Sequence, residues 1–244
     1  MFRFKQFDIE DEHCAMKVGT DAVLLGAWAE PLNSKLYTTL NSKLSTLNFL
    51  DIGTGSGVIA LMLAQRFANA HIVGIDIDEA AAQQAAANFA TSPWSDRLVA
   101  QHISLQDYTL NSTLSTTLHS KLYTLNLIVS NPPYFRSSLK CPDEGRKQAR
   151  HTDTLSYDEL IRCSAMLLAE DGVLALILPQ EAQEDILTLA AANGLHLWRL
   201  TQVITSPEKP AKRVLMALTK GEMAIEEEEL VLRHDHPLFK DFYL

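Results

Sequence analysis

The tetrapeptide Asn131-Pro132-Pro133-Tyr134 follows a short apolar run, Leu127–Ser130. A strand that ends in this way holds a planar carboxamide and an aromatic ring at the edge of a sheet. The amide oxygen and a neighbouring carbonyl can accept both hydrogens of a planar NH₂ group, and the ring can stack on the group that carries it. The tetrapeptide therefore predicts a site that presents an amino or amide nitrogen to an electrophile.

A second group of residues has the form of a nucleotide-binding loop. Asp51 is followed by Gly53, Gly55 and Gly57, which allow a tight turn and a close approach of the backbone to a ligand. Asp76 lies 19 residues beyond Gly57, where a carboxylate can accept hydrogen bonds from ribose hydroxyls. A carboxylate at Asp51 would repel a pyrophosphate but attract an ammonium group. This combination favours S-adenosylmethionine, which has an ammonium, a ribose and no phosphate, over a dinucleotide.

The elements that must position these motifs alternate between strand and helix. Expected strands cover 49–52, 71–77, 98–104, 127–130, 172–178, 196–204 and 214–219, and expected helices cover 58–67, 79–89, 157–168 and 183–193. The alternation predicts the α/β class, with a Rossmann-like, doubly wound, mostly parallel seven-stranded sheet, helices on both faces and an antiparallel last strand. Ligands of such sheets bind at the carboxyl ends of the strands, where both motifs fall.

The composition is that of an ordinary folded domain. The 244 residues are 47% hydrophobic with a net charge of −9, so a single domain over 1–244 is expected and a general nucleic-acid coat is not. The chain has neither a long apolar run nor a signal-peptide core, which predicts a cytoplasmic protein without a membrane partner. Cys14, Cys141 and Cys163 lack metal-type spacing, so reduced thiols and no bound metal are expected.

Basic residues nevertheless gather after Tyr134. The segment 136–151 contains five basic residues against two acidic ones, and two more basic residues stand at 212–213. Basic side chains beside a stacking ring are typical of phosphate and base binding. The candidate RNA contacts are Arg136, Lys140, Arg146, Lys147, Arg150, Lys212 and Arg213.

The chain also contains an internal repeat. The segments 33–49 and 111–127 are identical at 12 of 17 positions, and each ends at an expected strand. Their Ser, Thr, Asn and Leu residues follow neither helical nor strand periodicity. We interpret 33–48 and 111–126 as copies of one low-complexity segment inserted into two loops, which costs a fold little. We expect no specific function for them.

Together the motifs resemble known families. The glycine loop, Gly74–Asp76 and Asn131–Tyr134 resemble the class I S-adenosylmethionine-dependent methyltransferases that modify exocyclic or amide nitrogens. A narrower resemblance, to the bacterial tRNA1(Val) adenine-37 N6-methyltransferase family, is carried by the blocks 2–7, 14–28, 92–94, 131–135, 149–152 and 212–215. It extends over essentially the whole chain outside the two inserts, and the N-terminal blocks are its most specific part.

The resemblance implies roles that residue types alone do not reveal. Lys17, Thr20 and Asp21, in an N-terminal segment spanning 1–31, would close the pocket over the methionine part of the cofactor. The end of the third strand would hold the adenine moiety, although this chain has Ser104 where many relatives have an acidic residue. The expected cofactor-binding residues are Lys17, Thr20, Asp21, Asp51, Gly53, Gly55, Gly57, Asp76, Ile77, Ser104, Leu105 and Asn131.

The expected reaction is methyl transfer to N6 of adenine 37 in tRNA1(Val). Asn131 and the Pro132 carbonyl would accept the two amine hydrogens, so that the nitrogen pyramidalises and its lone pair faces the methyl group. Pro133 would restrict the bend, and Tyr134 would stack on a base held outside the helical stack. Positioning and polarisation would supply the catalysis, without a metal.

Other substrates carry a similar planar amine. The same tetrapeptide can hold a glutamine amide of a release factor or N2 of a guanine in rRNA, and a non-catalytic protein binding cofactor and RNA is a further alternative. Only 50 residues precede Asp51, too few for the helical domain that release-factor enzymes usually carry. No segment between the strands is large enough for the target-recognition part of a DNA methyltransferase, so DNA is not expected as a partner.

Overall fold

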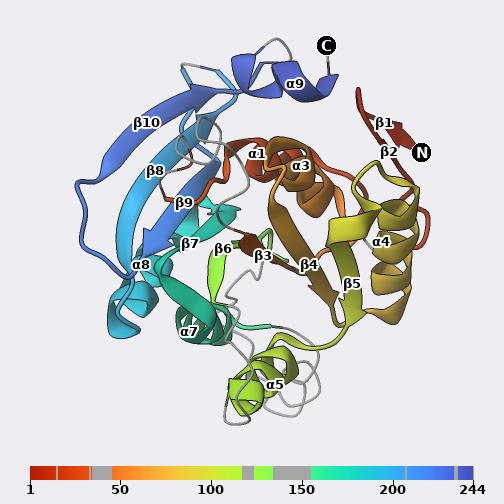
Figure 1. Ribbon diagram of the computed structural model, residues 1–244. Helices are drawn as coiled ribbons and strands as arrows, with labels where there is room; N and C mark the ends of the chain where they lie inside the picture. Colours follow the sequence, from red (N-terminus) through yellow and green to blue (C-terminus); the bar gives the residue numbers. More distant parts are fainter. Residues whose placement is uncertain are drawn as a thin grey trace, which may run out of the picture.

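A mixed sheet of eight strands forms the centre of the molecule, with helices on both faces (Figure 1). The computed structural model describes residues 1–14, 16–32, 34, 46–116, 124–133, 155–206, 208–233 and 236–243. The strand order is β10-β8-β9-β7-β6-β3-β4-β5. Its strands are β3 (Leu47–Ile52), β4 (Ala70–Asp76), β5 (Leu98–His102), β6 (Leu125–Ser130), β7 (Leu168–Pro179), β8 (His196–Ile204), β9 (Arg213–Thr219) and β10 (Glu226–Val231). A separate hairpin is formed by β1 (Phe2–Arg3) and β2 (Asp8–Ile9).

Helices cover the two faces as separate layers. The α-helices are α1 (Thr20–Trp28), α3 (Val58–Arg66), α4 (Glu79–Thr91), α5 (Leu105–Thr116), α7 (Tyr157–Leu167), α8 (Gln183–Ala192) and α9 (Lys240–Tyr243). Three short 3₁₀ turns lie at Ser95–Arg97, Gln180–Ala182 and Pro237–Phe239. Buried side chains of α1, α3 and α4 belong to one hydrophobic cluster, and those of α7 and α8 belong to another. The predicted α/β class and the helices on both faces are therefore confirmed.

The sheet changes winding direction between β3 and β6. These two strands are parallel neighbours, and the chain runs from β3 through β4 to β5 on one side and from β6 to β7 on the other. Strand β9 is antiparallel to both β7 and β8, as expected for the last predicted strand. A crevice forms beyond the carboxyl ends of strands at such a reversal. Both sequence motifs begin at these ends.

An eighth strand corrects the expected count of seven. Strand β10 pairs in parallel with β8 at the edge of the sheet, although four of its six residues are exposed glutamates. The glutamates hide the apolar alternation that marks a strand, yet Glu228 accepts hydrogen bonds from Thr201 and Arg199 of β8. A charged edge also discourages pairing with another chain.

The two repeat copies end on paired strands. Phe49 of β3 pairs with Leu127 of β6, and the Asn48 amide donates to the Asn126 side chain at 2.9 Å. Both pairs have the sequence offset of 78 that relates the copies. The second copy is not loop throughout, since its residues 111–116 continue α5. The stretches 35–45 and 117–123 lie outside the described residues. The strands that follow them in the sequence, β3 and β6, begin at the edge of the sheet opposite the motif-bearing ends.

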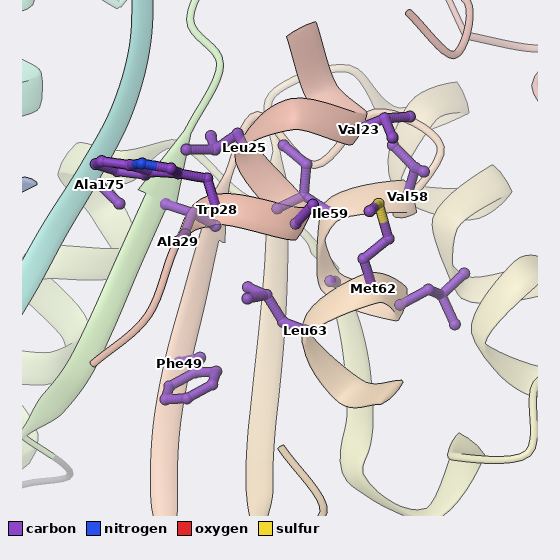
Figure 2. Close-up of a cluster of buried hydrophobic side chains, with 14 of the residues drawn as sticks. Val23, Leu25, Trp28, Ala29, Phe49, Val58, Ile59, Met62, Leu63 and Ala175 are labelled. Atoms are coloured by element: carbon purple, nitrogen blue, oxygen red, sulfur yellow. The ribbon is translucent and has the colours of Figure 1, made fainter. Parts of the chain in front are cut away.

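Helix α1 is anchored against α3, as Figure 2 shows for the cluster around Leu25, Trp28 and Met62. A Cβ on Gly26 would lie 2.8 Å from the sulfur of Met62, so only glycine lets the helices approach this closely. Trp28 is 2% exposed and Trp198 9%, so both are core residues. The packing fixes the amino end of α1 beside the amino end of α3.

Candidate active site

A cavity of about 570 Å³ lies at the carboxyl ends of β3, β4 and β6. Its walls come from the glycine loop, the end of β4, the start of α5 and the segment Asn131–Pro133. A second cavity of about 300 Å³ adjoins it. The two cavities share the lining residues Met16, Gly53, Gly55 and Asn131–Pro133. The first volume falls within the usual range for small-molecule sites.

The glycine loop forms a tight turn between β3 and α3. Gly55 has φ +55°, and no atom lies within 4 Å of where a Cβ would stand, so its exposed side faces open space. Gly57 has φ +82°, and a Cβ there would collide with the ring of Phe89. Gly55 therefore leaves room for a ligand, and Gly57 lets α4 pack against the turn. Gly53 also has a positive φ and lines both cavities.

Asp76 holds the glycine loop from the end of β4. Its Oδ2 accepts the Gly55 amide at 2.9 Å, and its Oδ1 accepts the Asp78 amide at 3.0 Å. Each carboxylate oxygen has a second lone pair, so Asp76 can accept two further hydrogen bonds. The residue lines the first cavity together with Ile77, whose side chain is 59% exposed.

Asp51 occupies the opposite environment. It is fully buried, it lines neither cavity, and its Oδ2 accepts the Thr54 hydroxyl at 2.8 Å. Its Oδ1 has no hydrogen-bond partner of normal geometry among the described residues. Burial raises the pKa of Asp51 to about 7, whereas the Thr54 hydroxyl and the Ala60 amide act in the opposite direction. Any influence of Asp51 on a ligand therefore acts across the loop above it and not by direct contact.

The N-terminal segment covers both cavities. Lys17 donates from Nζ to the carbonyls of Asp11 and Glu12, at 2.6 and 3.1 Å, and the Val18 amide donates to the Asp11 carboxylate at 3.0 Å. These bonds give the segment a fixed turn. Lys17 and Thr20 both line the second cavity.

Asp21 lines the second cavity and joins it to strand β9. The Arg213 Nε donates to its Oδ2 at 2.9 Å, in an ion pair whose side chains are 32% (Arg213) and 26% (Asp21) exposed. Arg213, expected as a phosphate contact, thus pairs with Asp21 of α1, whereas the neighbouring Lys212 is exposed. The arrangement connects a candidate RNA-binding strand with the wall of a candidate cofactor site.

Sequence reasoning did not single out two carboxylates in the wall of the first cavity, one at the start of α5 and one on α7. Ser104 accepts the Asp107 amide at 3.1 Å and donates its hydroxyl to the Asp107 carboxylate at 2.7 Å. Asp107 lines the first cavity with Ser104 and Leu105, and so does Glu159 of α7, which accepts a hydrogen bond from the Gln106 side chain at 3.0 Å. The Ser-x-x-Asp spacing is a helix-capping signal that could have identified Asp107. Glu159 is brought there only by the tertiary fold.

Asn131 stands where the two cavities meet. The Ser130 hydroxyl donates to the Ile52 carbonyl at 2.9 Å, which ties the end of β6 to the end of β3. Asn131 is half-buried, Pro132 is buried and Pro133 is exposed. Tyr134, Arg136, Lys140, Arg146, Lys147 and Arg150 lie outside the described residues. Among the residues that are described, no His, Cys, Asp and Glu side chains cluster as metal ligands.

Comparison with known proteins gives the family. Residues 33–190 match the model of the methyltransferase small domain. The tRNA1(Val) (adenine(37)-N6)-methyltransferase of Bacteroides fragilis is 42% identical over 243 residues, covering 100% of this chain and 94% of the relative. The protein of the same name from Flavobacterium psychrophilum is 37% identical, covering 100% and 96%. This chain belongs to the tRNA1(Val) (adenine(37)-N6)-methyltransferase family. The resemblance noted in the sequence is therefore confirmed.

Solved methyltransferase structures share the fold of this family member at low identity. A predicted O-methyltransferase from Agrobacterium tumefaciens is 19% identical with a TM-score of 0.58, and the match covers 89% of each chain. A putative RNA methyltransferase from Pyrococcus horikoshii is 11% identical with a TM-score of 0.55, covering 89% of this chain and 93% of that one. These likenesses confirm the Rossmann-like methyltransferase fold.

The first cavity suits the cofactor expected of such an enzyme. Among the described residues that line it, four are acidic and none is a lysine or arginine: Asp76, Asp78, Asp107 and Glu159. Such a wall repels the pyrophosphate of a dinucleotide and attracts a cation. S-adenosylmethionine has no phosphate, its sulfonium joins the adenosine to the methionine part, and its ribose hydroxyls can donate to carboxylates, so the residues present fit it.

No described helix is long and apolar enough to cross a membrane.

Proposed function

We propose that this protein transfers a methyl group from S-adenosylmethionine to N6 of an adenine in tRNA, namely adenine 37 of tRNA1(Val). The observation that carries the proposal is an acidic cavity that meets Asn131–Pro133 at the point where the sheet reverses. Relatives that are 37–45% identical over at least 93% of this chain are named for this reaction, which indicates the substrate. A reaction on tRNA places the protein in the cytoplasm.

We assign the first cavity to the adenosine half of the cofactor. Asp76 would accept the ribose hydroxyls, with Ile77 beside the adenine ring. Ser104 and Leu105 would border the adenine, and Asp107 would supply the carboxylate that Ser104 lacks. When bound, S-adenosylmethionine would supply the electrophilic methyl group.

The second cavity is assigned to the methionine half. Lys17, Thr20 and Asp21 line it from one side, and the glycine loop with Gly53 and Gly55 lines it from the other. The amino ends of α1 and α3 both border this cavity, and neither has a side-chain cap. Uncapped helix starts favour a carboxylate such as that of methionine. Asp51 would act from beneath by adjusting the charge and position of the loop.

The substrate amine would be held at Asn131. An exocyclic amine is a poor nucleophile because its lone pair is delocalised into the purine ring. The Asn131 side-chain oxygen and the Pro132 carbonyl would accept its two hydrogens, which pyramidalises the nitrogen and frees the lone pair. Pro133 would hold the bend and Tyr134 would stack on the base, a contact worth about 1–3 kcal/mol per base. The rate enhancement would come from positioning and preorganised dipoles.

Basic side chains near the two cavities would bind the tRNA backbone. Lys212 lies within the described part of the chain, next to the Arg213–Asp21 pair, and its exposed side chain is a candidate for a phosphate contact. Five further candidates follow Tyr134, namely Arg136, Lys140, Arg146, Lys147 and Arg150. Phosphate contacts of this kind orient a nucleic acid without reading its sequence.

The proposal is tested by analysing the nucleosides of tRNA that was incubated with the protein and methyl-labelled S-adenosylmethionine. We expect labelled N6-methyladenosine that maps to position 37. Labelled N2-methylguanosine, or label only in a protein acceptor such as a release factor, would support the alternatives instead. Binding of cofactor and tRNA without any label transfer would indicate a non-catalytic protein.

The matched variant is Asn131→Ala. We expect it to bind S-adenosylmethionine almost normally while its turnover falls at least about 100-fold, because the lost carboxamide acts on the amine. Equal turnover in the variant and the unmodified protein would remove Asn131 from the mechanism.

A further inference from the structure

A buried asparagine on α4 joins the two parts of the chain that enclose the cavities. Asn88 is 5% exposed, and its side-chain oxygen accepts the Glu10 amide at 3.1 Å. Its side-chain nitrogen donates one hydrogen to the Glu10 carbonyl at 2.7 Å and the other to the Ser56 carbonyl at 2.8 Å. Neither the sequence motifs nor the proposed reaction assigns this residue a role.

The three bonds fix the orientation of the carboxamide. Reversing the amide would set its oxygen against two carbonyl oxygens and its NH₂ group against the Glu10 amide. Since the site is buried, water does not replace these partners at low cost. Aspartate has the same shape as asparagine but offers no NH₂ group, so it tests the two donated bonds.

Both segments joined by Asn88 contribute to the cavity walls. The chain after Glu10 supplies Cys14 and Met16 to the first cavity and Lys17 to the second. Ser56 belongs to the glycine loop and follows Gly55, whose amide is held by Asp76. The bonds of Asn88 therefore span from the N-terminal segment above the cavities to the loop at their base.

Other contacts hold the start of the chain independently of Asn88. Phe4 stacks on Phe7 with ring centroids 4.5 Å apart, and Phe7 meets Trp94 edge-on at 5.7 Å. The Lys5 amide donates to the Phe242 carbonyl at 3.0 Å. Loss of the Asn88 bonds would therefore release the stretch after Ile9 while the aromatic group keeps the hairpin in place.

We propose that Asn88 is a positioning residue that sets the separation between the N-terminal segment and the glycine loop, and through it the affinity for S-adenosylmethionine. This inference rests on the proposed function, because it assumes that the two cavities hold that cofactor. Asn88 lines neither cavity, so it acts on cofactor binding and leaves the methyl-transfer step unaffected.

The test compares Asn88→Ala and Asn88→Asp with Gln83→Ala. Gln83 is an exposed amide on the same helix that bonds Glu79, so its variant controls for loss of an α4 side chain. Calorimetry without RNA should show S-adenosylmethionine affinity about tenfold weaker in both Asn88 variants, a typical change for lost buried hydrogen bonds, and unchanged in the control. Single-turnover methylation at saturating cofactor should proceed within about threefold of the original rate, below the change expected for a lost transition-state contact.

Unchanged affinity in a folded Asn88 variant would overturn the inference, and so would a reduced single-turnover rate with normal affinity. If neither variant folds, hydrogen exchange in the unmodified protein decides. Cofactor should slow exchange at Glu10 as well as at Gly55, and protection at Gly55 alone would refute the coupling. Failure of the unmodified protein to bind the cofactor would instead defeat the proposed function.

Discussion

Two carboxylates stand at the carboxyl ends of the neighbouring strands β3 and β4, yet they meet opposite surroundings. Asp76 lies in the wall of the larger cavity, and each of its oxygens accepts a backbone amide. Asp51 is sealed beneath the glycine loop, where one oxygen accepts a hydroxyl and the other has no normal partner among the described residues. Asp76 is therefore available to a ligand, whereas burial of Asp51 in its charged form destabilises the fold.

The difference arises from the register between the two strands. Asp51 pairs with Gly74, and a Cβ on Gly74 would lie 2.6 Å from the Thr54 hydroxyl oxygen. The absent side chain at Gly74 gives Thr54 the room to fold back over Asp51. Asp76 is two residues further along β4, beyond this contact, and faces the cavity. Neighbouring acidic residues in a cofactor motif can therefore have separate roles, one in binding and one in setting the loop.

The strongest test of this comparison is Asp76→Ala. We expect S-adenosylmethionine affinity to fall on the order of 100-fold, because the variant loses the ribose acceptor and the bond that holds the Gly55 amide. Isothermal calorimetry measures the change, with circular dichroism to confirm that the variant is folded. Unchanged affinity would remove Asp76 from the cofactor site and erase the contrast with Asp51.

The variant Asp51→Asn tests the buried carboxylate through the pH dependence of folding stability. The folded-state pKa of about 7 exceeds the ordinary 3.8, so between these values the folded protein holds a proton that the unfolded chain has released. Stability therefore falls as pH rises through this window, and the whole cost, at most on the order of 4 kcal/mol, is present above pH 7. The neutral variant should melt at a higher temperature than the original protein at pH 8 but not at pH 4.

The melting temperatures of Asp51→Asn and the original protein are compared by thermal denaturation from pH 4 to 8. Parallel pH profiles for the variant and the original protein would show that Asp51 does not titrate in this range. The same variant should bind S-adenosylmethionine about tenfold more weakly at pH 8, because a neutral group no longer attracts the cation. A gain in stability with no change in affinity would separate Asp51 from the cofactor altogether.

The sequence predicted those parts of the fold whose side chains keep a regular period. Strands β3, β4 and β6 and helices α3 and α4 are apolar or amphipathic, and each was expected within a few residues of its observed bounds. Helix α1 gave no such signal, because six of its nine residues are buried and no polar face remains. Strand β10 gave none because exposed glutamates occupy most of it. Helix α1 and strand β10 therefore depend on contacts with neighbouring elements, α3 and β8, that a single sequence does not show.

The site follows the same rule. Glycines with positive φ and the acidic residue at the end of β4 carry their role in local sequence, so Gly55 and Asp76 could be expected where they are found. The roles of Asn88 and Glu159 depend on contacts between distant segments, so a single sequence does not reveal them. Burial of Asp51 likewise depends on Gly74 across the sheet, which explains why direct contact with a ligand was expected.

A third carboxylate, Asp21, extends the comparison to the RNA side. It is paired with a cation, Arg213, and separate Asp21→Arg and Arg213→Asp variants should each weaken tRNA binding several-fold by releasing β9 from the wall of the smaller cavity. The double variant restores an opposite-charge pair and should recover part of the loss. Filter binding at fixed salt measures the effect. If Arg213 instead touches phosphate directly, the double variant will be as weak as Arg213→Asp alone.

The smallest effect is expected at the other end of these strands. The inserts join the sheet at the amino ends of β3 and β6, whereas Asp51, Asp76 and Asn131 stand at or just beyond the carboxyl ends. Removing residues 36–44 should therefore leave cofactor affinity and tRNA methylation within about twofold, since loop length changes closure entropy only slowly. A folded deletion variant that lost methylation would show that the segment reaches the RNA. It would also remove the assumption that only the carboxyl ends of the strands carry function.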